Sequence, residues 1–375
     1  MTLKHADREH ALLSASSASR WLQCTPSAVI NDNLPDETSV FAEEGTKAHE
    51  IAEKAILARA NGSEEPVYEG DDIRIREELE PYIERVIETY QTLKNENGQA
   101  LLFPEMRVDY GNYAPEGFGT SDVVIISGET IYIIDLKFGR GVEVSAIDNP
   151  QMRLYALGAL DFFKKMYNLT KVVTRIDQPR IFNFSEEEIS VSDLVKWGSE
   201  VVRPLAEKAF RGEGELIPGD HCRFCKAAAT CPAKAQKELA LTEQKATLPD
   251  VELLTLDQIA DVLAKGKDLA AWLAKVEDYA LKQALAGESV PGFKVVEGKT
   301  FRKYRDEDAV AKQLIDAGYK EDEIYRKSLL TITDLTKVVG KQQMADLGDL
   351  IYKPEGKPTL VPESDKREPI GKEAN

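Results

Sequence analysis

The order of hydrophobic patterns along the 375 residues predicts a protein of the α/β or α+β class. Up to about residue 93, apolar side chains recur at helical spacing. From Leu101 the period changes to the alternation that is typical of strands, and a helical pattern with further strands follows residue 149. The expected core is therefore built from helices, then a sheet, then a helix and more strands.

Three helices are expected before the sheet, over residues 14–29, about 41–60 and about 75–93. Strands are expected over 101–110, 118–127 and 130–138, and Gly128 marks the turn between the last two. Asn149 and Pro150 offer an N-cap and a first-turn proline for a helix of about 150–166. The remaining elements of the core are expected to be strands over 171–177 and 180–184 and a helix of about 191–211.

Composition divides the chain into three parts. Residues 1–240 hold the core and end in a cysteine segment, residues 241–352 form an α+β region, and residues 353–375 are rich in proline and charge and are expected to be extended. The middle part is expected to hold a helix-rich stretch of about 253–286, a strand over 292–304 and two short helices. There Lys299, Arg302, Lys303 and Arg305 surround Phe301 and Tyr304, a mix that could follow a DNA strand, although a solvated strand face is the simpler interpretation.

The overall composition is that of an ordinary soluble globular protein, with 42% hydrophobic and 30% charged residues. No apolar run approaches the roughly 18 residues that span a bilayer, and the polar N-terminus does not resemble a signal peptide. A cytoplasmic location is expected, where thiols stay reduced and tend to serve metals or chemistry. The net charge of −17 argues against a diffuse nucleic-acid coat but leaves room for a local basic groove.

The hairpin around Gly128 and Glu129 carries the strongest chemical signal. If these two residues form the loop, residues equidistant from it face each other, and Asp122 lies opposite Asp135. Their Cβ atoms would be about 4.5–5.5 Å apart, so that both carboxylates could bind one divalent ion. Lys137 projects from the same face as Asp135.

Two carboxylates and a lysine match the needs of phosphodiester hydrolysis. A hard cation polarises the phosphate and acidifies a water, and a cationic group orients that water or stabilises the developing charge. The simpler alternative is a half-buried ion pair between Lys137 and an aspartate. The second aspartate in register, within so apolar a segment, favours the catalytic interpretation.

The spacing of Asp122 and Asp135-Leu136-Lys137 resembles the signature of the PD-(D/E)XK nuclease superfamily. Upstream, residues 44–49 (EGTKAH) resemble the Gly-Thr-x-x-His helix of its RecB-like branch, and downstream Gln151 and Tyr155 resemble the Gln-x-x-x-Tyr motif of that branch. Ser121 stands where many members have proline, a common departure in this branch. Glu105 resembles a further acidic position of some members.

This resemblance implies a restriction-endonuclease-like core, in which a central mixed sheet is flanked by helices. It also implies roles for the matching residues. Asp122, Asp135, His49 and the Leu136 carbonyl would bind Mg²⁺ or Mn²⁺, Lys137 would orient or activate the attacking water, and Gln151 and Tyr155 would position DNA.

The four cysteines form a second pattern, with Cys24 near the N-terminus and Cys222, Cys225 and Cys231 in a C-x2-C-x5-C segment. A Cys-x-x-Cys pair allows zinc, a redox dithiol or an iron–sulfur centre, and unrelated free cysteines are the remaining alternative. Four thiolates satisfy either tetrahedral zinc or a [4Fe–4S] cluster. The arrangement resembles the iron-staple nucleases, such as AddB and the iron–sulfur nucleases of CRISPR systems, which implies a [4Fe–4S] cluster.

We therefore expect a metal-dependent deoxyribonuclease, most simply an exonuclease that acts on single-stranded DNA or free ends. Residues 353–367 resemble the tail of a phage-encoded family of unknown function with this core, which implies phage recombination or replication, with single-strand-binding or recombination proteins as partners. Two alternatives remain, a non-catalytic DNA-binding or scaffold protein and a structure-specific endonuclease. No membrane association is expected.

Overall fold

The computed structural model describes residues 11–35, 40–140, 142–243, 256–296, 307–316 and 320–325, with a few single positions beyond them. The chain divides into two compact units, Met1–Val295 and Val296–Asn375. The first unit carries a five-stranded sheet and its helices, and the second carries the short helices α10 (Glu307–Asp316) and α11 (Glu321–Ile324). No helix among the described residues is long and apolar enough to cross a membrane.

The N-terminal segment folds as separate short turns, so the prediction of one helix over 14–29 was wrong. The turns are η2 (Ala15–Ser17), α1 (Ala18–Trp21) and α2 (Ser27–Asp32). Pro26 interrupts the helix because it has no amide hydrogen to donate and restricts the residue before it. The two long helices expected next are present as α3 (Val40–Asn61) and α4 (Asp71–Asn97).

The sheet has the strand order β1-β2-β3-β4-β5. Its strands are β1 (Leu101–Asp109), β2 (Phe118–Ser127), β3 (Thr130–Leu136), β4 (Lys171–Gln178) and β5 (Asn183–Ser190). Strands β3 and β4 are parallel, α5 (Pro150–Phe163) lies between them in the sequence, and the other neighbours are antiparallel. The expected α/β class with a mixed sheet flanked by helices is confirmed.

The last strand differs from the prediction. A strand over 180–184 was expected, but a short helical turn, η3 (Pro179–Ile181), ends β4, and β5 begins at Asn183. Pro179 ends the ladder because its nitrogen has no hydrogen to donate, and Phe182 takes a left-handed backbone, with φ 55°. Strand β5 therefore begins three residues later than expected.

The hairpin register agrees with the prediction. Val123 pairs with Ile134 and Ser127 with Thr130, so Gly128 and Glu129 form the loop. Asp122 and Asp135 hold the next positions along the same register, just beyond the last paired residues. Strand β3 carries buried residues on both of its faces, as expected of a strand that is covered on both sides of the sheet.

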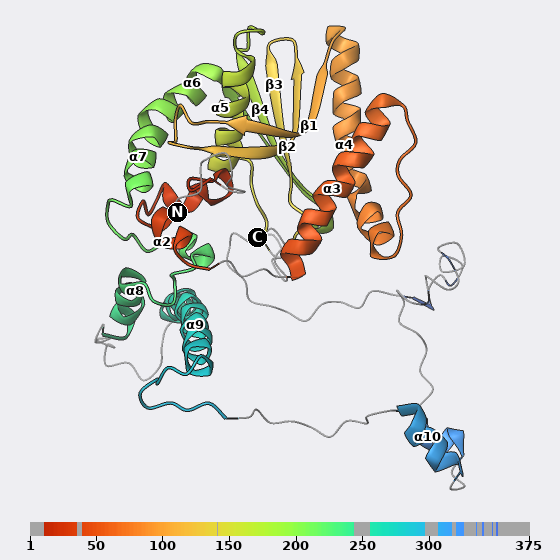
Figure 1. Ribbon diagram of the computed structural model, residues 1–375, viewed down its shortest axis with the longest axis vertical. Coiled ribbons are helices and arrows are strands. Elements are labelled where there is room, and N and C mark those ends of the chain that lie inside the picture. Colours follow the sequence, from red (N-terminus) through yellow and green to blue (C-terminus); the bar gives the residue numbers. More distant parts are fainter. Residues whose placement is uncertain are drawn as a thin grey trace. The chain divides into compact units, whose positions relative to one another are not determined.

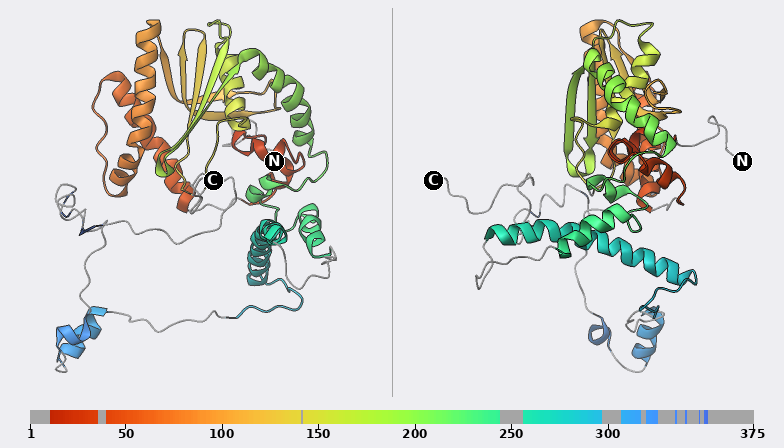
Figure 2. Two further views of the ribbon diagram at one scale, coloured as in Figure 1. Left: turned by 180° about the vertical axis from the view of Figure 1, so that it is seen from behind. Right: turned by 90° about the vertical axis from the view of Figure 1, so that its left-hand side faces the viewer.

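Helices cover both faces of the sheet (Figures 1 and 2). On one face, α5 and the N-terminal turns pack with Ile131 and Ile133 around Trp21. On the other face, α3 and α4 pack with Ile134 and Leu136. Successive residues of β3 thus enter different cores, and the polar residues at its carboxyl end lie between the helix layers.

The chain after β5 continues as a nearly unbroken helical stretch, as expected over 191–211. It consists of α6 (Val191–Trp197), the π-helical turn η4 (Gly198–Val202) and α7 (Arg203–Arg211). The cysteine segment follows with η5 (Asp220–Phe224), α8 (Pro232–Glu243) and α9 (Leu256–Leu285). Helix α9 contacts the cysteine segment, because Trp272 Nε1 donates to the Ala228 carbonyl at 3.1 Å and Lys275 Nζ to the Arg223 carbonyl at 2.7 Å.

Two predictions concern residues that are described only in part. Residues 292–296 form no strand, and the rest of the expected strand 292–304 lies outside the described residues. The basic and aromatic group, Lys299, Phe301, Arg302, Lys303, Tyr304 and Arg305, also lies outside them, as does the tail 353–375.

Candidate metal centre

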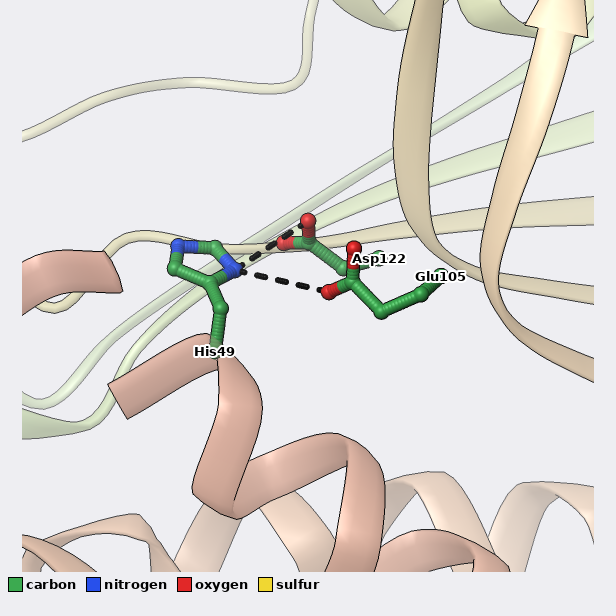
Figure 3. Close-up of side chains that lie close together, drawn as sticks. All are labelled: His49, Glu105 and Asp122. Carbon is green, nitrogen blue, oxygen red and sulfur yellow. Dashed lines mark ion pairs between the residues drawn. The ribbon is translucent and has the colours of Figure 1, made fainter. Parts of the chain in front are cut away.

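Three potential metal ligands from separate elements converge on one point (Figure 3). His49 comes from α3, Glu105 from β1 and Asp122 from β2, and one ligand atom of each lies within 4.8 Å of the other two. The Nδ1 atom of His49 is 3.2 Å from Asp122 Oδ1 and 4.0 Å from Glu105 Oε1. Within the described part of the chain, no other group of three histidine, cysteine or carboxylate ligands meets this spacing.

Strand register brings the two carboxylates side by side. Pro104 pairs with Val123 and Met106 with Ser121, so Glu105 and Asp122 hold the facing position between these pairs. Glu105 has a left-handed backbone, with φ 46°. Such a conformation costs a non-glycine residue about 1–3 kcal/mol and tends to occur at ligand sites. The strained backbone therefore lies at one of the three ligands.

The charges at this point are not balanced by the protein alone. Burial raises the pKa of Glu105, the charge of Asp122 raises it further, and the result is about 7. Burial lowers the pKa of His49, but the carboxylates of Asp122, Asp135 and Glu105 outweigh it and raise that pKa to about 9. Both pKa values are raised because several carboxylates lie close together at this point. Such a concentration of negative charge favours a bound cation.

A second group of polar side chains continues from Asp135. Its Oδ2 atom is 2.9 Å from Lys137 Nζ, and its Oδ1 accepts a hydrogen bond from Gln151 Nε2 at 3.0 Å. Lys137 Nζ donates to Gln151 Oε1 at 3.1 Å, and Gln151 Nε2 lies 3.4 Å from the Tyr155 hydroxyl. The α5 N-cap, Asn149, fixes the first turn that carries Gln151. The structure thus brings together Asp135, Lys137, Gln151 and Tyr155, as expected from the sequence.

The second group is buried, so the pKa values of Asp135 and Lys137 depend strongly on the charges beside them. Asp135 is 2% exposed. Burial raises its pKa, and the charge of Asp122 adds to the rise while Lys137 opposes it. Burial lowers the pKa of Lys137, but Asp135 and Asp122 raise it more, so the lysine stays cationic. Apart from the ion pair with Lys137, Asp135 Oδ2 has no hydrogen-bond partner within the described residues.

Asp122 connects the two groups. Its Oδ1 atom faces His49, and its Oδ2 atom accepts a 2.6 Å hydrogen bond from the Leu136 amide. The donors at the centre are imidazole and carboxylate, which suit Mn²⁺ and, for the oxygens, Mg²⁺. These residues therefore fit a divalent cation, with the under-bonded Asp135 Oδ2 nearby.

Helix α3 is held against the sheet by a buried arginine. Arg180, whose side chain is 7% exposed, ion-pairs with Glu44 at 2.8 Å and with Glu78 at 2.6 Å. Hydrogen bonds from Arg180 and then Arg74 lower the pKa of Glu44 to about 2. Glu44 precedes His49 by five residues on α3, so this contact fixes the helix that delivers the histidine.

The four cysteines, 24, 222, 225 and 231, line one cavity of about 220 Å³ together with apolar residues such as Ile30 and Ile217. All four thiols are free. The Gly219 amide donates to Cys222 Sγ at 3.4 Å, and Asn31 Nδ2 to Cys225 Sγ at 3.3 Å. Cys24 thus lies beside a segment almost two hundred residues away, although no three of the sulfurs lie within 4.8 Å of one another.

Comparison with known proteins assigns a family. Residues 10–368 match the family described as "Protein of unknown function (DUF2800)". The chain belongs to the DUF2800 family. One solved structure, titled "Crystal structure of SSO0001", is similar to this DUF2800 protein at 13% identity over 58% of this chain and 96% of that chain. Its TM-score of 0.23 is too low for any argument about the fold.

The group of three residues that the structure brings together differs from the ligand set expected from the sequence of this DUF2800 protein. The expected ligands were His49, Asp122, Asp135 and the Leu136 carbonyl, whereas the group within 4.8 Å contains Glu105 in place of Asp135. The facing positions of Glu105 and Asp122 do not follow from the sequence in the same way as those of Asp122 and Asp135, because the loop between β1 and β2 has no unambiguous turn signal from which to count residues.

Proposed function

We propose that this DUF2800 protein is a Mg²⁺- or Mn²⁺-dependent DNA nuclease. One observation carries the proposal: His49, Glu105 and Asp122 converge beside the Asp135–Lys137 ion pair. Hydrolysis of a phosphodiester needs a cation site and a protein cation at neighbouring positions, which is what these residues supply. The mixed sheet and the hairpin register are those expected of a PD-(D/E)XK nuclease and support the proposal.

Each residue would act through the contacts it makes. His49, Glu105 and Asp122 would hold the metal, which when bound polarises the phosphate and acidifies a water. Asp135 and Gln151 orient Lys137 Nζ from two sides, at 2.9 and 3.1 Å, and the ammonium would hold the attacking water or the developing negative charge. Tyr155, fixed through Gln151, would contact the DNA beside the reacting phosphate.

The cysteine cavity is the second candidate site for a metal cofactor. All four cysteines line one cavity, and four thiolates satisfy either a tetrahedral zinc ion or a [4Fe–4S] cluster. We propose a [4Fe–4S] cluster, which the resemblance to the iron-staple nucleases implies, and which would join the two ends of the nuclease domain; structural zinc is the alternative. The role of the cluster would be structural, since a redox step is not required.

End-labelled single- and double-stranded DNA, incubated with Mg²⁺ or Mn²⁺, tests the proposal. We expect cleavage that stops when a chelator removes the metal. Closed circular single-stranded DNA distinguishes the two modes, because an exonuclease leaves it intact and a structure-specific endonuclease opens it. DNA that is bound but never cleaved, with either metal and with the cysteine cluster loaded, would instead support a non-catalytic DNA-binding protein.

A further inference from the structure

One phenylalanine projects almost completely into solvent at the β4–β5 connection. The side chain of Phe182 is 94% exposed, whereas its neighbours Gln178 and Asn183 are 2% and 9% exposed. A ring of this size gains stability when it is buried, so full exposure at a well-anchored position is unusual. The Phe182 ring is therefore accessible to a binding partner.

The backbone of Phe182 adopts an energetically unfavourable conformation. Its φ of 55° lies in the left-handed region, which a bulky residue rarely occupies. The turn is nevertheless rigid, because Asn183 Nδ2 donates to Gln178 Oε1 at 2.7 Å and to the Val144 carbonyl at 2.8 Å. On the other side, Arg180 is fixed by Glu44 and Glu78. Strained residues that are held by their surroundings tend to occur at ligand contacts.

The turn adjoins the candidate active site. Parallel strands β3 and β4 end at the same edge of the sheet, and the Lys137 amide donates to the Asp177 carbonyl at 2.9 Å. The Arg180 guanidinium lies 3.9 Å from the centre of the Phe138 ring and donates to the Phe138 carbonyl at 3.3 Å. Phe182 therefore lies on a support that touches the residue directly after Lys137.

We propose that Phe182 is a stacking platform for a nucleobase of single-stranded DNA, next to the nucleotide whose phosphate is cleaved. This inference rests on the proposed nuclease function. A single protruding ring suits a flat base, which presents a π-face whatever its sequence. A protein partner would instead require a contiguous apolar patch, whereas of the two residues that flank Phe182, Ile181 is half-buried and Asn183 is polar and turned inward.

The test compares two oligonucleotides of equal length and charge, oligo(dT) and its fully abasic counterpart. Binding of each is measured by fluorescence anisotropy with Ca²⁺ in place of Mg²⁺, for the full chain with its cysteine cluster loaded. The variants are Phe182→Leu, which keeps apolar bulk without a ring, and Phe182→Trp, which keeps a ring. Phe162→Leu is the matched control, because Phe162 is 61% exposed on α5 but lies at the opposite end of that helix from Gln151.

We expect Phe182→Leu to weaken oligo(dT) binding at least about fivefold, the lower end of the range for base–aromatic stacking. Abasic binding should not change, Phe182→Trp should bind oligo(dT) like the wild type, and so should Phe162→Leu. Unchanged oligo(dT) binding in Phe182→Leu would overturn the inference. An equal loss for both oligonucleotides would also overturn it, because the ring would then act through the fold.

The outcome separates this inference from the proposed function. If wild-type protein cleaves DNA but binds oligo(dT) and the abasic strand equally, the stacking platform is wrong and the nuclease stands. If it binds neither oligonucleotide and cleaves no DNA, both are wrong.

Discussion

The candidate metal centre and the cysteine cavity are both clusters of ligand side chains, but they are assembled differently. At the metal centre, strand register and hydrogen bonds hold Glu105, Asp122 and His49 within 4.8 Å of one another. At the cysteine cavity, Cys24 and the 222–231 segment line a space of about 220 Å³, and no three of their sulfurs lie within 4.8 Å of one another. The protein therefore preorganises the first site more than the second, and the proposed cluster would complete the second.

The comparison predicts that substitutions in the polar group beside the candidate metal centre, Asp135 and Lys137, remove chemistry and leave the fold. Asp135→Asn and Lys137→Ala should each lower the cleavage rate about a thousandfold or more, because charge-stabilising groups and groups that act as a unit have effects of this size. The measurement is single-turnover cleavage with saturating enzyme and Mg²⁺ or Mn²⁺. DNA affinity should stay close to that of the wild type, and both variants should remain folded, although loss of one partner of a buried ion pair shifts the midpoint of thermal unfolding.

Lys164→Ala is the control for these variants. Lys164 also forms an ion pair, with Asp161, but at the far end of α5 from Gln151. Its loss should leave the rate unchanged. Full activity in Lys137→Ala would remove the proposed mechanism, since no other group occupies the position between Asp135 and Gln151 among the described residues.

The cysteine cavity should respond in the opposite way, with loss of the fold and only indirect loss of chemistry. Cys24→Ser and Cys225→Ser should be equally damaging, because both cysteines would bind the one proposed cluster and cluster binding would contribute to folding. We expect loss of the bound iron, about four atoms per chain in the intact protein, and a lower unfolding temperature. Iron and zinc analysis of anaerobically purified protein, with thermal unfolding, provides the measurement.

Ser27→Ala offers a matched control in the same cavity. Ser27 lines it and is 3% exposed, and its hydroxyl has no hydrogen-bond partner within the described residues. Removing that hydroxyl should leave both iron content and stability unchanged. One zinc ion per chain in colourless protein would contradict the iron cluster, and equal stability of Cys24→Ser and the wild type would contradict the structural role itself.

A substitution of Glu105 tests whether this residue is one of the metal ligands. Glu105→Gln removes one negative charge and one good ligand oxygen, so we expect Mn²⁺ affinity to fall about tenfold or more, in line with other metal-site substitutions. Calorimetric titration of Mn²⁺ measures this, and a high metal concentration should restore part of the cleavage rate. Glu116→Gln is the control, because Glu116 has a similar left-handed backbone but does not belong to the metal group. Equal affinity in wild type and Glu105→Gln would exclude Glu105 from the ligands.

The smallest expected effect concerns the stability that the ion pairs of Glu44 give to α3, the helix that carries His49. The pKa of Glu44 is lowered to about 2 by Arg180 and Arg74, so its ion pairs stabilise the folded state above the ordinary carboxyl pKa of about 4.5. That contribution is lost as the pH falls from about 4.5 towards 2. Glu44→Gln should therefore lower the free energy of unfolding at pH 7 by about 1–2 kcal/mol. The difference from the wild type should shrink as the pH falls through this window.

Denaturant unfolding at a series of pH values, with intact metal sites, measures the effect. A difference that grows on acidification would contradict the assigned direction of the Glu44 shift. Glu50→Gln, an exposed acid on the same helix, controls for a general change of charge on α3.

The sequence by itself determined the features that depend on short-range geometry. Alternation and a two-residue turn specify the β2–β3 register, so the facing positions of Asp122 and Asp135 follow from counting residues. The spacing of Gln151 and Tyr155 on one helix likewise gives their common face. Such patterns are local, because strand and helix periods fix the direction of neighbouring side chains.

Only the tertiary structure decided how distant segments meet. It brought Glu105 to the ligand position, placed Cys24 beside Cys225, and left Phe182 exposed next to a turn that is anchored by Arg180. None of these follows from periodicity, because each depends on contacts between residues far apart in the sequence, whose free energies of packing and ion pairing outweigh weak local preferences.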